Sequence, residues 1–173
     1  MGRTILFVTL TAVLLALAAG TAFAAVLQGT PGPDELKGDN GSDRLWGGAG
    51  RGQLDGRGGD DLLRGEAGED TLVDHAGNDV LRGGPGDDTF GGNPGDETVF
   101  GGRGDDILLD DAGVDAFSGG GGDDVIAVPG FGPGPPGLPF ESDRISCGPG
   151  NDRVVAHEVD LVAADCEVVN RIE

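Results

Sequence analysis

A nine-residue period runs through the middle of the chain and constrains its fold more than any other feature. Counting from Gly29 in steps of nine gives eleven uninterrupted units that end at Ala127. Glycine occupies the fourth position of every unit and the first position of nine, with Asp74 and Asp110 as the exceptions. The period predicts a solenoid, because one short unit cannot bury its own apolar side chain whereas stacked copies bury a continuous row.

The positions of the glycines and of one apolar residue predict the shape of each unit. Glycines three residues apart permit positive φ and close backbone approach, so the first six residues are expected to form a turn. The last three residues are expected to form a short strand, in which the eighth side chain points into the core and its neighbours point outward. The eighth-position residues are Leu36, Leu45, Leu54, Leu63, Leu72, Leu81, Phe90, Val99, Leu108, Phe117 and Ile126.

Two units match one pattern at every defined position, Gly-Gly-x-Gly-x-Asp-x-apolar-x. They are Gly101–Leu109, GGRGDDILL, and Gly119–Ala127, GGGGDDVIA. This pattern resembles the haemolysin-type (RTX) calcium-binding repeat family, strongly over residues 29–127 and weakly over 138–155. The resemblance implies an all-β fold, a right-handed parallel β-roll with two units per turn. It also implies Ca²⁺ ions between stacked turns, held by sixth-position carboxylates of units n and n+2 and by turn carbonyls.

Carried onto this sequence, the resemblance assigns ten carboxylates to two edges of the roll. One edge carries Asp34, Asp70, Asp88, Asp106 and Asp124, and the other carries Asp43, Asp61, Asp79, Glu97 and Asp115. Turn carbonyls near Gly59, Gly68, Gly77, Gly86, Gly104 and Gly122 are expected to complete the oxygen shells.

Departures from the pattern make the expected sites unequal. Gly52 offers no carboxylate, so the sites that it would share are expected to be weak or empty. Glu97 is one methylene longer than aspartate, so the two sites that it shares are expected to be among the weaker ones. The intact aspartate pairs are 43/61, 61/79, 70/88, 88/106 and 106/124. They predict about five firm Ca²⁺ sites, with up to about four weaker ones.

The charge balance agrees with a cation as the partner. Asp and Glu number 31 against 11 Lys and Arg, a formal net charge of −20, which argues against nucleic acid and anionic membrane surfaces. Each unit buries little apolar surface and its aspartates repel one another. Calcium is therefore expected to switch the chain from disorder to order.

Residues 1–24 resemble a secretory signal peptide. Arg3 precedes an apolar run from Ile5 to Ala19, followed by the small-residue pattern Ala22-Phe23-Ala24. The run is too short to span a bilayer, so the protein is expected to be secreted, with cleavage before Ala25 and no membrane span. Two cysteines in an exported chain predict a disulfide. They are Cys147 and Cys166.

The repeat frame divides the rest of the chain. The roll is expected over 25–127, a Pro/Gly-rich loop over 128–137, degenerate repeats over 138–155 and a C-terminal cap over 156–173. A cap is expected because the end of a solenoid exposes an unpaired edge.

No enzyme motif is complete. His157-Glu158 begins like a zinc-peptidase HExxH motif, but Leu161 stands at its fifth position. The carboxylate pairs recur along the repeats, whereas acid/base catalysis needs one dissimilar pair.

The sequence therefore favours a secreted, non-catalytic calcium-binding module with a structural or interaction role outside the cell. The alternative is an accessory module or relative of a larger secreted effector, such as an epimerase, a protease or a haemolysin-like toxin. A permanently disordered calcium sponge conflicts with the unbroken eighth-position row. The sequence does not identify a protein or surface-polysaccharide partner.

Overall fold

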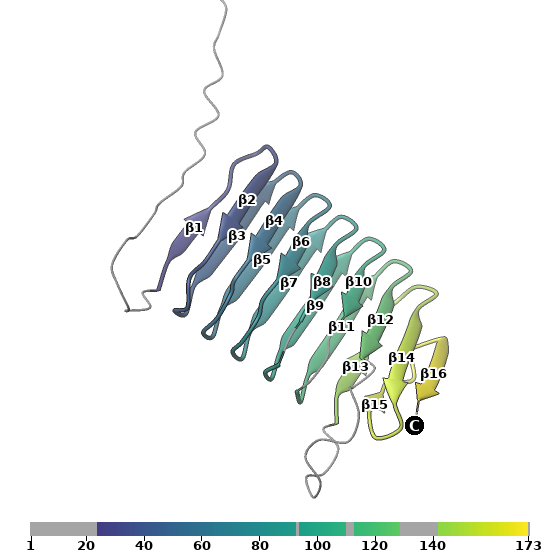
Figure 1. The fold of residues 1–173 in the computed structure, drawn as a ribbon. Coiled ribbons are helices and arrows are strands. Elements are labelled where there is room, and N and C mark those ends of the chain that lie inside the picture. The colour runs from purple at the N-terminus through teal and green to yellow at the C-terminus, as the bar shows by residue number, and fades with distance from the viewer. Residues whose placement is uncertain (1–23, 93, 110–112, 129–141, 173) are drawn as a thin grey trace, which may run out of the picture.

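The chain forms a parallel β-roll. In the computed structural model, residues 24–92, 94–109, 113–128 and 142–172 are described, and they form sixteen strands. These strands make two parallel sheets of eight strands each, which lie against one another along the roll (Figure 1). Odd-numbered strands form one sheet, here the odd sheet, and even-numbered strands form the even sheet. The expected all-β parallel roll is confirmed.

The strands of the two sheets differ in length. The odd sheet contains β1 Val26–Gln28, β3 Arg44–Ala49, β5 Leu62–Ala67, β7 Val80–Pro85, β9 Thr98–Arg103, β11 Ala116–Gly121, β13 Arg144–Ser146 and β15 Leu161–Val162. The even sheet contains β2 Asp34–Lys37, β4 Gly52–Asp55, β6 Thr71–Val73, β8 Thr89–Gly91, β10 Ile107–Leu109, β12 Val125–Val128, β14 Arg153–His157 and β16 Val168–Ile172.

The expectation of a three-residue strand in every unit is wrong for the odd sheet. From β3 to β11 its strands have six residues, because they continue through the first three positions of the next unit. There the second-position glycines adopt positive φ and still pair across turns, as Gly84 does with Gly102 and Gly102 with Gly120. On the opposite edge, the described residues at the first two positions lie outside the strands, and the third-position residues Gly58 and Ala76 form a single parallel bridge.

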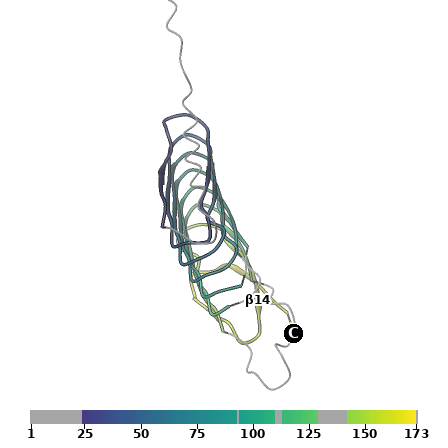
Figure 2. The ribbon, with the colours of Figure 1, turned by 60° about the vertical axis from the view of Figure 1, so that its left-hand side comes forward.

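The strand register gives two units per turn. Leu45 pairs with Leu63 and Leu63 with Leu81, so equivalent residues lie 18 positions apart. The turns stack on one another, as Figure 2 shows in a view closer to the roll axis. Sixth-position residues of units n and n+2 therefore come side by side.

The core is a double row of eighth-position side chains. From Leu45 to Ile126, every such side chain is at most 4% exposed. Leu36, in the first unit, is half-buried and packs against the N-terminal end of this core together with Leu27. The expectation of one core residue per unit is confirmed, with the weakest burial where no earlier turn covers the row.

The turns require glycine where carbonyls stack. Gly86 has a φ of 135°, and a β-carbon there would overlap the carbonyl oxygen of Gly68. Two residues with side chains adopt positive φ at second positions, Arg57 at 76° and Glu66 at 75°.

The roll continues beyond the eleven units. β13 pairs with β11 and β14 with β12, and residues from the segment expected to form a cap add β15 and β16 to the two sheets. The predicted disulfide is present between Cys147 and Cys166, whose Cα atoms lie 5.2 Å apart.

Two predicted segments fall almost wholly outside the described residues. They are the signal peptide at 1–24, of which only Ala24 is described, and the loop at 128–137, of which only Val128 is described. Within the described ranges, no helix has the length and apolar character needed to cross a membrane.

Candidate metal centres

Sixth-position carboxylates line each edge of the roll, immediately before the strands or, for Asp34, at the first residue of one. We call the residues that precede even-sheet strands the even row and those that precede odd-sheet strands the odd row. The even row contains Asp34, Asp70, Asp88, Asp106 and Asp124, with Gly52 in second place, and the odd row contains Asp43, Asp61, Asp79, Glu97 and Asp115. Of the ten predicted ligands, all but Asp34 are at most 3% exposed.

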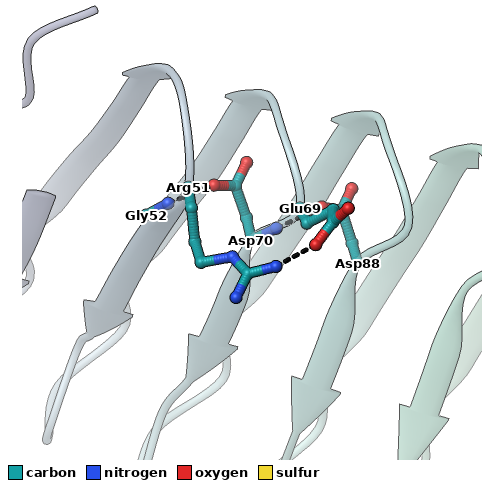
Figure 3. Close-up of polar contacts among 5 residues, drawn as sticks. All are labelled: Arg51, Gly52, Glu69, Asp70 and Asp88. Carbon is teal, nitrogen blue, oxygen red and sulfur yellow. Dashed lines mark hydrogen bonds and ion pairs between the residues drawn. The ribbon is translucent and has the colours of Figure 1, made fainter. Parts of the chain in front are cut away.

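The backbone of the preceding turn orients these carboxylates. The N–H of Gly52 donates to Asp70 Oδ1 at 2.5 Å, and the N–H of Asp70 donates to Asp88 Oδ1 at 2.8 Å (Figure 3). The same bond joins Asp88 to Asp106 at 2.8 Å. The ion pair between Arg51 and Glu69 lies beside this row, and both of its side chains are exposed. One oxygen of each of these three carboxylates, Asp70, Asp88 and Asp106, is thus held in place by the fold.

The second oxygen of most of these carboxylates is buried without a hydrogen-bond donor. This holds for Oδ2 of Asp61, Asp70, Asp79, Asp88, Asp106 and Asp124. A buried anionic oxygen without a donor is costly, because it has lost water and gained nothing in exchange. A row of them needs cations or protons to compensate its charge.

The surroundings of these oxygens supply further oxygen atoms. A β-carbon at Gly83 would overlap Asp88 Oδ2 and lie 2.7 Å from the carbonyl oxygen of Gly101. A β-carbon at Gly101 would overlap both Asp106 Oδ2 and the carbonyl oxygen of Gly119. The first-position glycines therefore leave a cradle between a carboxylate oxygen and a carbonyl oxygen of the next turn. An all-oxygen environment suits calcium.

The six predicted turn carbonyls also stack between turns. A β-carbon at the next fourth-position glycine on the same edge would overlap each of them. The residues that carry these carbonyls are Gly59, Gly68, Gly77, Gly86, Gly104 and Gly122. Their role as calcium ligands stays a prediction.

Burial raises the pKa of several row aspartates, because their negative charge has lost water. Desolvation raises the pKa of Asp61, Asp88 and Asp106 to about 7 and that of Asp124 to about 6, although a backbone N–H bond partly lowers each. Neighbouring carboxylates raise these pKa values further. Each row must therefore take up either cations or protons.

Asp34 differs from the other predicted ligands. Its side chain is half-buried, and Oδ2 accepts hydrogen bonds from Thr30 N at 2.6 Å and Thr30 Oγ1 at 3.0 Å. Its neighbour in the row is Gly52, which has no carboxylate. The expectation of a weak or empty site here stays a prediction, and the local bonding agrees with it.

The rows extend past the ligands that the sequence indicated. Asp115 N donates to Asp143 Oδ1 and Asp124 N to Asp152 Oδ1, each at 2.9 Å. These bonds span 28 residues instead of 18, because the chain between β12 and β13 contains ten extra residues. Asp160 and Glu167 follow in the odd and even rows. The recurring Asp-Arg-apolar triplets at 143–145 and 152–154 were the available signal.

Asp74 was also missed, since it occupies a first position where the pattern requires glycine. It is 1% exposed and lies close to Asp79 and Glu97. Burial is the main cause that raises its pKa to about 8, followed by repulsion from Asp79.

Comparison with known families agrees with the geometry. A family profile described as RTX calcium-binding nonapeptide repeat (4 copies) matches residues 20–54, 55–90 and 91–126, more than half of the chain. A search of curated proteins finds no match.

Proposed function

Because the chain belongs to the RTX calcium-binding nonapeptide repeat family, we propose that it is a secreted protein that folds as Ca²⁺ fills both edges of its roll. Outside the cell it serves as a structural or interaction module without catalytic activity of its own. The observation that carries the proposal is the row of buried carboxylate oxygens that have no hydrogen-bond donor.

Pairs of sixth-position carboxylates from successive turns would hold the ions. In the even row the pairs are 70/88, 88/106 and 106/124, and in the odd row they are 43/61 and 61/79. Asp124 with Asp152 adds a pair of the same kind. When bound, Ca²⁺ would supply the positive charge that these oxygens lack, and the turn carbonyls would add neutral ligands.

Folding depends on the ion because the roll has few other sources of stability. Each unit buries one apolar side chain, worth roughly 1.5–3 kcal/mol, while every ordered backbone residue costs about 1–2 kcal/mol. The net charge of −20 adds repulsion along both rows. A cation that binds only the folded chain adds its binding free energy to stability.

Two observations support the extracellular part of the proposal. The Cys147–Cys166 disulfide is typical of an oxidising compartment. The apolar run from Ile5 to Ala19 with the Ala22-Phe23-Ala24 pattern has the composition of an export signal.

Circular dichroism of the purified chain without residues 1–24 tests the proposal. We expect disorder in chelator, β structure in millimolar Ca²⁺, and little effect of Mg²⁺, which prefers a small octahedral shell. Isothermal titration under the same conditions counts the ions. A chain that is equally folded in excess chelator, or that binds no calcium, would contradict the proposal.

A further inference from the structure

Asp74 places a carboxylate where most repeats have only a hydrogen atom. It stands at a first position, which is glycine in nine of the eleven units. At Gly38 and Gly56, the equivalent positions on the same edge, the space that a β-carbon would fill lies against Oδ2 of Asp43 and Oδ2 of Asp61. The backbone at Asp74 keeps the register of the roll, since its N–H faces the carbonyl of Gly91. The Asp74 side chain therefore enters the cradle itself, and it is only 1% exposed.

Three carboxylates meet at this point of the odd row. One oxygen each of Asp74, Asp79 and Glu97 lies within 4.8 Å of the others. Asp79 belongs to the same unit as Asp74, and Glu97 belongs to the next turn on this edge. All three side chains are at least 98% buried, with exposures of 1%, 1% and 2%.

Asp79 supplies a separate indication of a ligand. Its Oδ1 accepts the N–H of Asp61 at 2.6 Å, which fixes the orientation of the carboxylate. Its Oδ2 is buried and accepts no N–H or neutral hydroxyl bond, and its hydrogen-bonding neighbour is a second acid, Asp74. Because Asp79 is only 1% exposed, water does not compensate its charge, and a cation or a proton shared with Asp74 must do so.

We propose that Asp74 is an additional ligand at the site shared by Asp79 and Glu97, so that three carboxylates hold one Ca²⁺ ion there. This inference rests on the proposed function and adds to it a residue that the repeat pattern does not provide. Calcium affinity rises with the number of charged ligands. The site therefore binds more tightly than the two-carboxylate sites, which reverses the expectation that Glu97 weakens it.

The position of the site gives it a role in assembly. Asp74 begins the sixth of the eleven units, so this ion lies near the middle of the roll. In a repeat protein each turn contacts only its neighbours, and order spreads outward from the first turns to form. The ion at Asp74 is the first to bind as calcium rises, and turns on both sides then order against it.

Titration of three variants beside the parent tests the inference. Asp74→Asn removes the charge with little change in size, and Asp74→Gly restores the residue found in nine units. Asp60→Asn is the matched control, because Asp60 lies on the same edge and is exposed, and an asparagine there can still accept the N–H of Asn78. All three variants change the net charge by one.

The readouts are Ca²⁺ isothermal titration and the luminescence lifetime of Eu³⁺ added as a calcium substitute. We expect both Asp74 variants to weaken the tightest calcium class about tenfold. They should also raise the number of waters on the tightest Eu³⁺ ion, while Asp60→Asn changes neither value. If Asp74→Asn does not fold in saturating calcium, Asp74→Gly decides the question.

If the Asp74→Gly protein keeps the parent's tightest class of calcium sites, or binds calcium more tightly than the parent, the inference is overturned and the proposed function is not. A parent that binds no calcium would overturn the proposed function as well, so the two failures are distinguishable.

Discussion

Asp88 is the residue whose substitution tests the placement of the ions most sharply, because it belongs to two proposed sites. Its Oδ1 accepts the N–H of Asp70 at 2.8 Å, and its own N–H donates to Asp106 Oδ1 at 2.8 Å. Its Oδ2 is buried without a donor. Asp88→Asn keeps a carbonyl oxygen for the bond from Asp70 and removes the charge and the second ligand oxygen. The change therefore separates ion binding from the backbone network.

The size of the effect follows from linkage between folding and ion binding. If each site has a Kd of ~10⁻⁴ M, free Ca²⁺ at ~1 mM adds about 1.4 kcal/mol per site. Loss of two sites then costs about 3 kcal/mol. About five of the roughly seven proposed sites would remain, so a folding midpoint near ~1 mM free calcium should rise roughly threefold.

Asp34→Asn is the matched control. Asp34 faces Gly52 across the row, and its Oδ2 already accepts two bonds from Thr30. The free calcium concentration at which the Asp34→Asn variant is half folded, followed by circular dichroism, should stay within about twofold of the parent's, because no two-carboxylate site is lost. Equal shifts for the two variants, or a larger shift for Asp34→Asn, would refute the pairing of carboxylates from successive turns.

Three further predictions concern the turns, the disulfide and the pH dependence. Gly104 has a φ of 122° and no room for a β-carbon beside the carbonyl of Gly86, so Gly104→Ala should lower the unfolding free energy in calcium by about 2 kcal/mol or more. Gly32→Ala, whose β-carbon would meet only Thr30 Oγ1 at 3.7 Å, should cost less than about 1 kcal/mol, and similar losses in urea denaturation would contradict this account. The disulfide joins residues 19 positions apart, so its reduction should lower the free energy of unfolding by about 3 kcal/mol. An unchanged free energy of unfolding in urea with reductant would contradict a stabilising disulfide. Because burial raises the folded-state pKa of three row aspartates to about 7, protonation stabilises the calcium-free fold at low pH, and this contribution disappears as pH rises through about 7. In chelator, circular dichroism should therefore show more β structure at pH 5 than at pH 8, and the reverse order would contradict the shifts.

The sequence by itself determined the core and most of the two rows. Side chains alternate along a strand with a period of two, so the sixth and eighth positions both point to the inner face. The apolar eighth residue lies within the strand and forms the core row, whereas the acidic sixth residue lies at the start of the strand and forms the row at the edge. Leu63, Leu108 and Ile126 are fully buried, as expected. These relations are local and recur in every unit, which makes them readable from spacing alone.

Only the tertiary structure decided how far the rows extend and where they depart from the repeat. Asp143 and Asp152 enter the rows because the strands that follow them pair with β11 and β12 across ten extra residues. The sequence predicted degenerate repeats over 138–155, but the ten extra residues removed the fixed spacing, so the frame could not indicate which strands they would pair with. Asp74 broke the pattern at a glycine position, and only the packing of two turns shows that its side chain turns inward to Asp79 and Glu97. The difference is physical: spacing along the chain specifies which face a side chain takes, whereas the contacts between turns decide which side chains meet.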